Sequence, residues 1–296
     1  MSSGSGALTL FATVSRLHIV TIGCLGTLTF GWLLSGRYLL VCAAFSALDW
    51  FLVNLLNRVV DIPEDEANRI AGTDFVRRNA RTMKWGGLAL LAASIAATPL
   101  VAGALVPWRL AFHALGLAYN WPLLPGGRRI KQLYFWKNTA SAVGFLLTLF
   151  AYPLAIMGGR VPLAPGVTST SVVLLATFFF LFELSYEVLY DLRDAAGDLA
   201  SGIRTYPVVH GEAVALRIVY ALAGAAAAAL VLGYATGALP WRAVVMIAAP
   251  ALQIAYTRRV ERARRVTTGD CVTLTWIGAS LLACYHLWIL AKLPGV

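Results

Sequence analysis

Long apolar runs dominate this sequence and limit the folds that it can adopt. Nine stretches consist mainly of apolar side chains, each close to the length of about 20 residues that an α-helix needs to cross a bilayer. Only 13% of the 296 residues are charged, whereas an average soluble domain has about 25%. The sequence therefore predicts an all-α integral membrane protein, with nine transmembrane helices in a bundle around a central cavity. The predicted spans are residues 10–34, 38–60, 84–104, 107–124, 133–157, 170–192, 213–235, 239–257 and 271–292.

Basic residues predict the orientation of this bundle, because Lys and Arg are enriched in short cytoplasmic loops. If the N-terminus is cytoplasmic, 19 of the 24 Lys and Arg residues fall in inner segments. We therefore expect the N-terminus inside and the C-terminus outside, in the bacterial cytoplasmic (inner) membrane. The net charge of +10 then belongs mainly to the inner face. No stretch resembles a nucleic-acid-binding module, so we expect a lipid bilayer and not nucleic acid as the partner.

Two clusters of acidic residues follow apolar runs on this inner side. The first reads Asn57-Arg-Val-Val-Asp61-Ile-Pro-Glu64-Asp65, and the second runs from Glu187 through Asp191 and Asp194 to Asp198. Carboxylates near a membrane span are costly, and they commonly mark functional sites. Both clusters face the same side, so we expect them to share one task, with the mouth of the site at the cytoplasmic face.

The spacing of the clusters suggests two related halves within a single domain of residues 1–296. Asp61 and Asp191 are 130 residues apart, which is about four helices at the length of a membrane span. We expect a first half at about 10–124, a second half at about 133–257, and a ninth helix at about 271–292. Paired halves of this kind occur in several membrane protein folds.

Helical geometry gives each cluster a common face. Residues four apart share one side of an α-helix, as do Asn57 and Asp61, and Asp194 and Asp198. Pro63 should disturb or end the helix at about residue 62, which would place Asp65 in the loop just beyond. Gly197 is a candidate for the end of the second helix. In the sixth predicted span, residues 170–192, Glu183, Glu187 and Asp191 are four residues apart and form one stripe.

Hard oxygen ligands without His or Cys partners suit Mg²⁺, which protein carboxylates hold together with water and substrate phosphates. Two facing sites of this kind would hold a diphosphate between two Mg²⁺ ions. Basic residues would neutralise the remaining charge, and the candidates are Arg16, Arg69, Lys131, Lys137, Arg193 and Arg204. The alternative is a set of interfacial salt bridges, for example Asp194 with Arg193 or Arg204.

A polyanion site at the mouth of an apolar bundle indicates an amphipathic substrate, and an isoprenyl diphosphate fits. Mg²⁺ would stabilise the departing diphosphate as charge develops on it. The allylic cation would then be captured by a small hydrophobic acceptor, and water would have to be excluded.

At this point the motifs resemble those of a known family, the intramembrane UbiA prenyltransferases. Asn57-xxx-Asp61-xxx-Asp65 is similar to the family's NDxxDxxxD motif. Asp191-Leu-Arg-Asp194-Ala-Ala-Gly-Asp198, followed by Gly202, Thr205 and Pro207, is similar to its DxxDxxGDxxxGxxTxP motif. Tyr119-Asn-Trp-Pro122 and Lys131 to Lys137-Asn138 resemble its YSxP…K…KN stretch. The nine helices and the orientation also agree with this family.

The resemblance implies Mg²⁺-dependent transfer of a prenyl group from its diphosphate to an acceptor, often an aromatic or quinone precursor. It implies that Asn57, Asp61 and Asp65 bind one Mg²⁺ and that Asp191, Asp194 and Asp198 bind the other. Lys131, Arg69 and Arg204 would then contact the diphosphate, and we expect Asp61, Asp191 and Asp198 to be the least replaceable residues.

Two departures from the family pattern bear on the substrate. Arg58 stands at the second position of the first motif, where the family usually has Asp, and the RTxxRP signature of haem-farnesylating members is absent after Asp65. The second departure argues against haem as the acceptor. The second motif is closer to that of members acting on homogentisate, chlorophyllide or glycerol-phosphate ethers.

Other residues could contact the acceptor, and other functions stay open. Asp49 and Glu183 lie deeper than the clusters, where each either orients the acceptor, takes its proton, or links helices by hydrogen bonds. Tyr119, Asn120 and Tyr186 are further candidates for acceptor contacts. One alternative function is a terpene cyclase on the same scaffold, which needs no acceptor. A second alternative is a membrane transporter.

Overall fold

The computed structural model describes residues 3–158, 161–263 and 265–293, and within these ranges every regular element is a helix. A single isolated β-bridge joins Leu124 and Arg128 in this part of the chain. The first half contains α1 (Ser3–Val14), α2 (Leu17–Ser35), α3 (Leu40–Val60), α4 (Ile62–Ala67), α5 (Thr73–Ala102) and α6 (Val106–Asn120). The second half contains α7 (Trp136–Leu146), α8 (Tyr152–Met157), α9 (Ser169–Ala200), α10 (Tyr206–His210), α11 (Glu212–Ala235), α12 (Trp241–Val244), α13 (Ala248–Ala263) and α14 (Thr268–Leu290).

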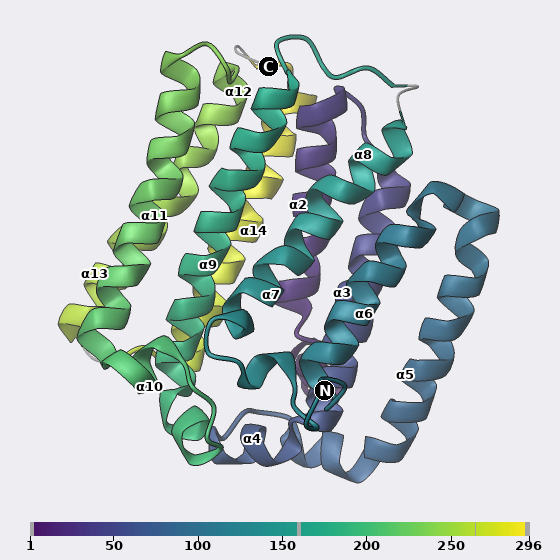
Figure 1. The fold of residues 1–296 in the computed structure, drawn as a ribbon, viewed down its shortest axis with the longest axis vertical. Coiled ribbons are helices and arrows are strands. Elements are labelled where there is room, and N and C mark those ends of the chain that lie inside the picture. Colours follow the sequence, from purple (N-terminus) through teal and green to yellow (C-terminus); the bar gives the residue numbers. More distant parts are fainter. Residues whose placement is uncertain (1–2, 159–160, 264, 294–296) are drawn as a thin grey trace.

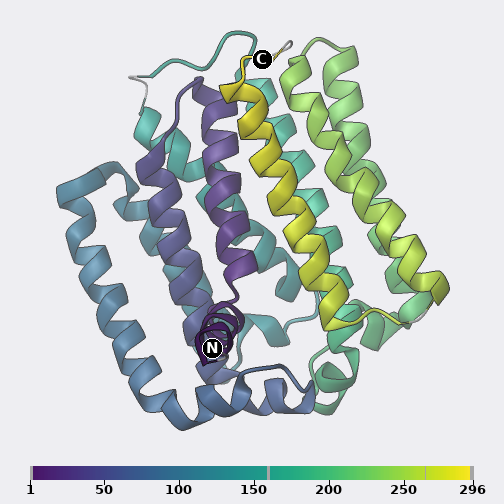
Figure 2. The same ribbon diagram turned by 180° about the vertical axis from the view of Figure 1, so that it is seen from behind.

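The long helices stand side by side and form a bundle (Figures 1 and 2). α9 packs along α11, α3 along α2, and α14 along α2. α5 stands at one edge of the bundle, and α11 with α13 at the other (Figure 1). The short helices α4 and α10 and the N-terminus lie at one end, and α14 finishes at the opposite end. We call the end with α4 and α10 the α4 end.

The structure identifies an integral membrane protein. Seven helical stretches are long and apolar enough to cross a membrane among the described residues. One of them, residues 73–120, holds both α5 and α6, which fold back beside each other (Figure 1). The predicted span 239–257 is not among the seven, because α12, a short 3-10 turn and α13 divide this segment. The count of nine spans therefore remains a prediction.

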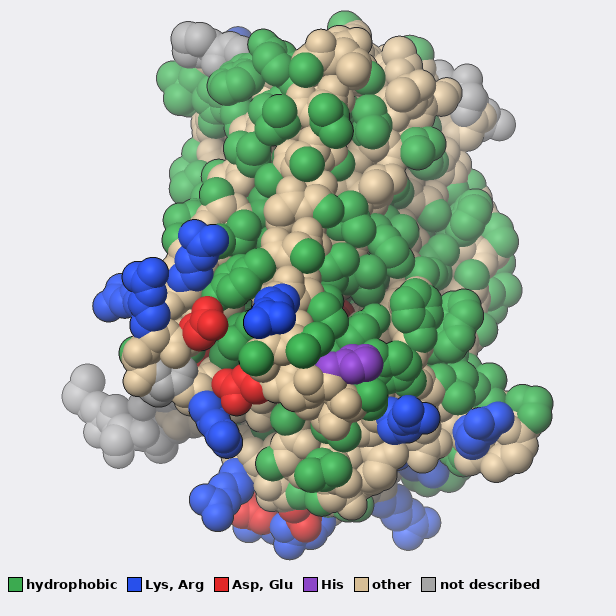
Figure 3. All heavy atoms as spheres, turned by 60° about the vertical axis from the view of Figure 1, so that its left-hand side comes forward, with side chains coloured by type: hydrophobic (Ala, Val, Ile, Leu, Met, Phe, Trp, Pro, Cys, Tyr) green, Lys and Arg blue, Asp and Glu red, His purple; other side chains and the backbone are tan. Residues whose placement is uncertain are grey.

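The charged side chains are distributed as the bilayer requires. On the face drawn in Figure 3, hydrophobic side chains cover the half away from the α4 end, whereas Lys, Arg, Asp and Glu gather toward that end. Charged groups are stable at the aqueous boundary and costly in hydrocarbon. The side of the membrane that the α4 end faces stays a prediction.

Two local expectations at the acidic clusters are wrong. Asp65 does not lie in a loop, because α3 ends at Val60 and α4 begins at once with Pro63 in its first turn, where proline is tolerated. Gly197 does not end a helix, because α9 continues to Ala200. A Cβ atom at Gly197 would lie 2.3 Å from the Asn68 side chain. The glycine is therefore needed where α4 meets α9.

The first predicted span is interrupted near its beginning. α1 and α2 are separate helices, and the backbone of Arg16 between them has a φ of 49°. This left-handed conformation is uncommon for a residue with a side chain. It directs the chain from α1 into α2 and leaves Arg16 at the α4 end of the bundle.

Asp49 has a structural role. It is fully buried on α3, where it accepts hydrogen bonds from Arg109 Nε at 3.0 Å and Tyr152 Oη at 2.7 Å. His113 Nε2 lies 2.8 Å from the same carboxylate. Arg109 also donates to the carbonyl oxygen of Ser94. This network links α3, α5, α6 and α8, so the structural interpretation of Asp49 is confirmed.

Replacing one partner of this network should destabilise the bundle. Asp49→Asn leaves the Arg109 guanidinium buried without its counter-charge, which costs about 3 kcal/mol or more. Unfolding by dodecyl sulfate in mixed micelles measures the loss. The double variant Asp49→Asn/Arg109→Met should lose less than the two single variants added together. Additive losses would contradict this account.

Candidate functional site

One cavity of about 840 Å³ opens among α2, α3, α6, α7, α9 and α14, and both acidic clusters line it. Its walls include eight carboxyl groups and four Lys or Arg side chains from the described part of the chain. The carboxyl groups belong to Asp61, Glu64, Asp65, Glu183, Glu187, Asp191, Asp194 and Asp198, and the cations to Arg16, Lys131, Lys137 and Arg193. The acids therefore outnumber the cations at this cavity by two to one.

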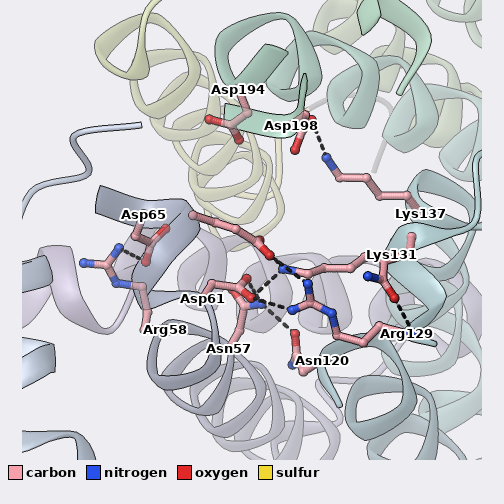
Figure 4. A network of polar contacts seen from close by, with 12 residues as sticks. Asn57, Arg58, Asp61, Asp65, Asn120, Arg129, Lys131, Lys137, Asp194 and Asp198 are labelled. Atoms are coloured by element: carbon pink, nitrogen blue, oxygen red, sulfur yellow. Dashed lines mark hydrogen bonds and ion pairs between the residues drawn. The ribbon is translucent and has the colours of Figure 1, made fainter. Parts of the chain in front are cut away.

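Asp61 stands at the junction of α3 and α4 and is held from three directions. Asn57 Nδ2 donates to Asp61 Oδ2 at 2.7 Å and to Asn120 Oδ1 at 2.6 Å. Lys131 forms an ion pair with Asp61 and a second with Glu64. Arg129 donates to Glu64 at 2.8 Å. Figure 4 shows these side chains converging on Asp61.

The electrostatics of Glu64 follow from these pairs. Burial raises the pKa of Glu64, but Lys131 and then Arg129 lower it more, so its pKa lies below the ordinary value. Glu64 is therefore ionised at neutral pH, and it contributes a charge at the edge of the cavity.

Arg58 fixes the position of Asp65. Its fully buried guanidinium pairs with Asp65 and donates to the carbonyl oxygen of Ala71 at 2.8 Å. Arg16 approaches the other oxygen of Asp65 at 3.8 Å. Burial still raises the pKa of Asp65 above its ordinary value, although both arginines lower it. Arg58 is thus a structural partner of Asp65.

The second cluster lies on α9 and is joined to α7 by Lys137. Lys137 Nζ lies 2.8 Å from Asp191 Oδ1 and 2.8 Å from Asp198 Oδ2. Asn138 Nδ2 donates to the other oxygen of Asp191 at 2.9 Å. Asp194 instead pairs with the neighbouring Arg193, whose Nε lies 2.7 Å away. Figure 4 shows Asp194 and Asp198 across an open space from Asp61 and Asp65.

Away from the mouth the cavity becomes aromatic. Its lining there includes Phe30, Trp50, Phe112, Phe145, Phe178, Phe179 and Phe182. Tyr119 on α6 and Tyr186 and Tyr190 on α9 line the cavity nearer the acids. The site therefore has an ionic mouth and an apolar interior, which suits a molecule with a charged head and a hydrocarbon tail.

The donor set at the mouth fits a divalent cation that is shared with a ligand. Among the described residues, no three His, Cys, Asp or Glu side chains converge closely enough to hold a metal alone. Mg²⁺ rarely needs such a cage, because water and phosphate oxygens complete its coordination. The excess of carboxylates at the mouth favours this ion. In addition, the buried Oδ1 of Asn138 has no hydrogen-bond partner in the described structure.

Most predicted site residues meet at this cavity, but two do not. The predicted residues that line it are Asn57, Asp61, Asp65, Arg16, Tyr119, Asn120, Lys131, Lys137, Glu187, Asp191, Arg193, Asp194 and Asp198. Arg69 and Arg204 are both exposed and lie outside its lining. Arg204 instead lies over the ring of Tyr134 at 5.9 Å. Their proposed contact with a diphosphate remains a prediction.

Sequence reasoning assigned no role in the site to Glu64, Arg129 or Asn138, although Glu64 and Asn138 stand within the motifs. Glu64 lies one turn beyond Asp61 and points to the same lysine, and Arg129 pairs with Glu64. Asn138 binds Asp191 from α7. The spacing of Asp61 and Glu64 could have identified Glu64, because residues three apart share a helical face. Nothing in the local pattern identifies Arg129, since its partner is 65 residues away.

Comparison with protein-family models gives one match, to the UbiA prenyltransferase family over residues 17–278. Two curated relatives are named digeranylgeranylglyceryl phosphate synthase. The protein from Methanopyrus kandleri is 35% identical over 160 residues, which are 51% of this chain and 58% of that protein. The protein from Halobacterium salinarum is 28% identical over 253 residues, covering 83% of this chain and 84% of that protein.

Solved structures share the fold. A UbiA homologue from Archaeoglobus fulgidus, bound to GPP and Mg²⁺, matches with a TM-score of 0.71 at 17% identity, over 95% of this chain and 99% of that one. The apo structure of a UbiA homologue from Aeropyrum pernix K1 matches with a TM-score of 0.66, also at 17% identity, over 91% of this chain and 98% of that one.

Inorganic pyrophosphate with Mg²⁺ should stabilise the protein through both acidic clusters. At about 100 times the dissociation constant, a ligand adds about 2.7 kcal/mol, which raises the melting temperature by roughly 5–10 °C. Thermal unfolding in nanodiscs measures this increment. Asp61→Asn and Asp198→Asn should each remove most of it. The control Asp74→Asn, at an exposed position on α5, should retain it. An undiminished increment in both cluster variants would refute the shared site.

Proposed function

The chain belongs to the UbiA prenyltransferase family, and from this premise we propose that it transfers a prenyl group from an isoprenyl diphosphate to a hydrophobic acceptor within the membrane. One observation carries the proposal. Acidic clusters that are 130 residues apart in the sequence line the ionic mouth of a single cavity whose interior is aromatic. A diphosphate fits the mouth and its prenyl chain fits the interior.

The residues at the mouth divide into two roles. Asn57, Asp61 and Asp65 would hold one Mg²⁺ ion at the α3–α4 junction. Asp191, Asp194 and Asp198 would hold a second on α9. Cationic groups would bind the diphosphate oxygens directly, and those that line the cavity are Lys131, Lys137, Arg16 and Arg193. Arg69 and Arg204 lie outside the lining and would attract the diphosphate as the substrate enters the cavity.

Cleavage of the bond between C1 and the diphosphate oxygen leaves an allylic cation. Mg²⁺, when bound, supplies positive charge to stabilise the departing diphosphate. Lys131 and Lys137 add two ammonium groups at the same end. The aromatic rings that line the cavity, among them Tyr119 and the deeper phenyl rings, would stabilise a cation and exclude water, which would otherwise capture it.

Two classes of acceptor follow from different observations. The resemblance of the motifs implies an aromatic compound or a quinone precursor. The names of the two curated relatives point instead to a glyceryl phosphate lipid. Both classes carry an apolar portion that suits the aromatic interior of the cavity. Acceptors of both classes should be included in the assay, because the glyceryl phosphate class comes from the names of the two relatives described above.

The proposal also includes the orientation of the site. The basic loops support a cytoplasmic position for the α4 end, and we retain the bacterial cytoplasmic membrane as the proposed location. The organisms of the relatives named above are archaeal, so a cytoplasmic membrane of an archaeon is the alternative. In both cases the diphosphate reaches the site from the cytoplasm.

A terpene cyclase would use the same mouth but would need no acceptor. Mass spectrometry of the products separates the two functions. The purified protein is incubated with Mg²⁺ and prenyl diphosphates of several lengths, with and without phenolic, quinone-precursor and glyceryl lipid acceptors. A prenylated acceptor supports the transferase. A hydrocarbon or terpene alcohol formed without acceptor supports the cyclase.

Removal of either acidic cluster should abolish turnover. Asp61→Asn and Asp198→Asn should each lower the rate of diphosphate release by about 100-fold or more, because each removes a charged ligand for the Mg²⁺ that would stabilise the departing diphosphate. A coupled phosphate assay measures the rate, and Asp74→Asn serves as the matched control. Full Mg²⁺-dependent turnover in both variants would show that the proposed function is wrong.

A further inference from the structure

Two glutamates lie between the ionic mouth and the aromatic interior of the cavity. Glu183 and Glu187 stand on α9, and both line the cavity. At a rise of 1.5 Å per residue, Glu187 lies about 6 Å and Glu183 about 12 Å along the helix from Asp191. The diphosphate end of a substrate at Asp191 therefore places C1 and the following carbons beside this pair.

Other polar groups on this face of α9 already have partners. Tyr186 Oη donates to the carbonyl oxygen of Leu274 at 2.8 Å. Tyr190 Oη lies 2.9 Å from Thr275 Oγ1. Both tyrosines are therefore tied to α14. The two glutamates are the groups on this face with hydrogen-bonding capacity left for a ligand.

Glu183 and Glu187 have fewer hydrogen-bond partners than the two tyrosines. Ser141 Oγ donates to Glu187 Oε1 at 2.6 Å, which leaves the second carboxylate oxygen available. Glu183 is 9% exposed, and its carboxyl group makes no hydrogen bond or ion pair within the described residues. Its neighbours at the apolar end are Phe182, which lies against Tyr186 at 5.2 Å, and Phe178, which stacks on Phe182.

An unpartnered carboxyl group in an aromatic wall is costly unless it serves a ligand. A purely structural glutamate would be expected to bond to a neighbouring helix, as Asp49 does. Two carboxyl groups one helical turn apart also repel each other when both are charged. The pair therefore presents two neighbouring carboxyl groups to a ligand that enters the cavity.

We propose that Glu183 and Glu187 form the acceptor site and take the proton of an acceptor hydroxyl group as the prenyl group is transferred. This inference rests on the proposed function and adds the identity of the acceptor residues. In the step, the C1–O bond to diphosphate breaks and its electron pair leaves with the diphosphate. The acceptor oxygen forms a bond to C1, its O–H bond breaks, and the proton passes to the carboxylate of the pair.

The same geometry selects the acceptor. Carboxylates repel an anionic group, so a neutral hydroxyl is bound at this depth, and any phosphate of the acceptor lies nearer the cationic side chains at the mouth. A hydroxyl group is a weak nucleophile until its proton is removed, which makes a base useful. An acceptor that is already ionised has no proton to give and does not need the pair.

The test measures binding of the prenyl diphosphate and transfer of the prenyl group separately, in the 296-residue protein in nanodiscs. The variants are Glu183→Gln and Glu187→Gln, which keep the side-chain volume, and the control is Glu261→Gln on the exposed part of α13. The first readout is binding of geranyl thiolodiphosphate with Mg²⁺. The second is transfer from geranyl diphosphate to 1-O-hexadecylglycerol, para-cresol and para-nitrophenol at pH 8.

Both glutamine variants should bind the thiolodiphosphate within about twofold of wild type, which also shows that they fold. Their transfer to hexadecylglycerol and to cresol should fall about 100-fold, the usual contribution of a general base. Transfer to nitrophenol, which is largely ionised at this pH and is repelled by the carboxylates, should be low in the wild type and should not fall in the variants. The control variant should behave as wild type in every assay.

The results that overturn the inference are distinct from those that overturn the proposed function. Unchanged transfer in both variants, or an equal loss for all acceptors, shows that the pair is not the base. Loss of thiolodiphosphate binding in the variants would assign Glu183 and Glu187 to the binding site of the prenyl diphosphate instead. A wild-type protein that binds the analogue but prenylates no hydroxyl acceptor contradicts the acceptor class. A wild-type protein that neither binds nor transfers contradicts the proposed function as well.

Discussion

An excess of carboxylates at one end of an apolar helix bundle is the condition on which the rest of this structure depends. Lys131 draws Asp61 and Glu64 together, and Lys137 draws Asp191 and Asp198 together. Each lysine thus fastens an acidic cluster to the α6–α7 region of the bundle. The charge that they leave unmatched is stable only if further cations enter the mouth. A divalent cation shared with a diphosphate meets that need, which connects the stability of the site with its chemistry.

The path of the backbone brings the two acidic clusters to the same cavity. α3 stops at Val60 so that α4 can turn across the mouth, and Gly197 on α9 leaves room for Asn68 from α4. These features bring two segments that are distant in sequence to opposite sides of one cavity. The chain belongs to the UbiA prenyltransferase family, and this arrangement of acids around one cavity suits that activity. Family membership also removes the support for the transporter considered from the sequence.

Sequence reasoning predicted the membrane class and the two clusters because both depend on local patterns. Apolar runs of membrane length predict helices, and the spacing of Asp191, Asp194 and Asp198 predicts a common face. Contacts between distant segments left no such pattern. The pairing of Arg129 with Glu64 is one case, and the contact of Gly197 with Asn68 is another. The Asp49–Arg109 pair is a third, because the sequence could not distinguish a buried structural acid from one that serves the acceptor.

The most direct test of the central claim is a structure of this protein with Mn²⁺ and a prenyl thiolodiphosphate. Anomalous scattering locates the manganese ions independently of the protein model-building. The account predicts manganese beside both Asp61 and Asp191, with the diphosphate between them and the prenyl chain directed past Glu187 into the aromatic interior. Manganese at neither cluster, or a diphosphate bound outside the cavity, would contradict it.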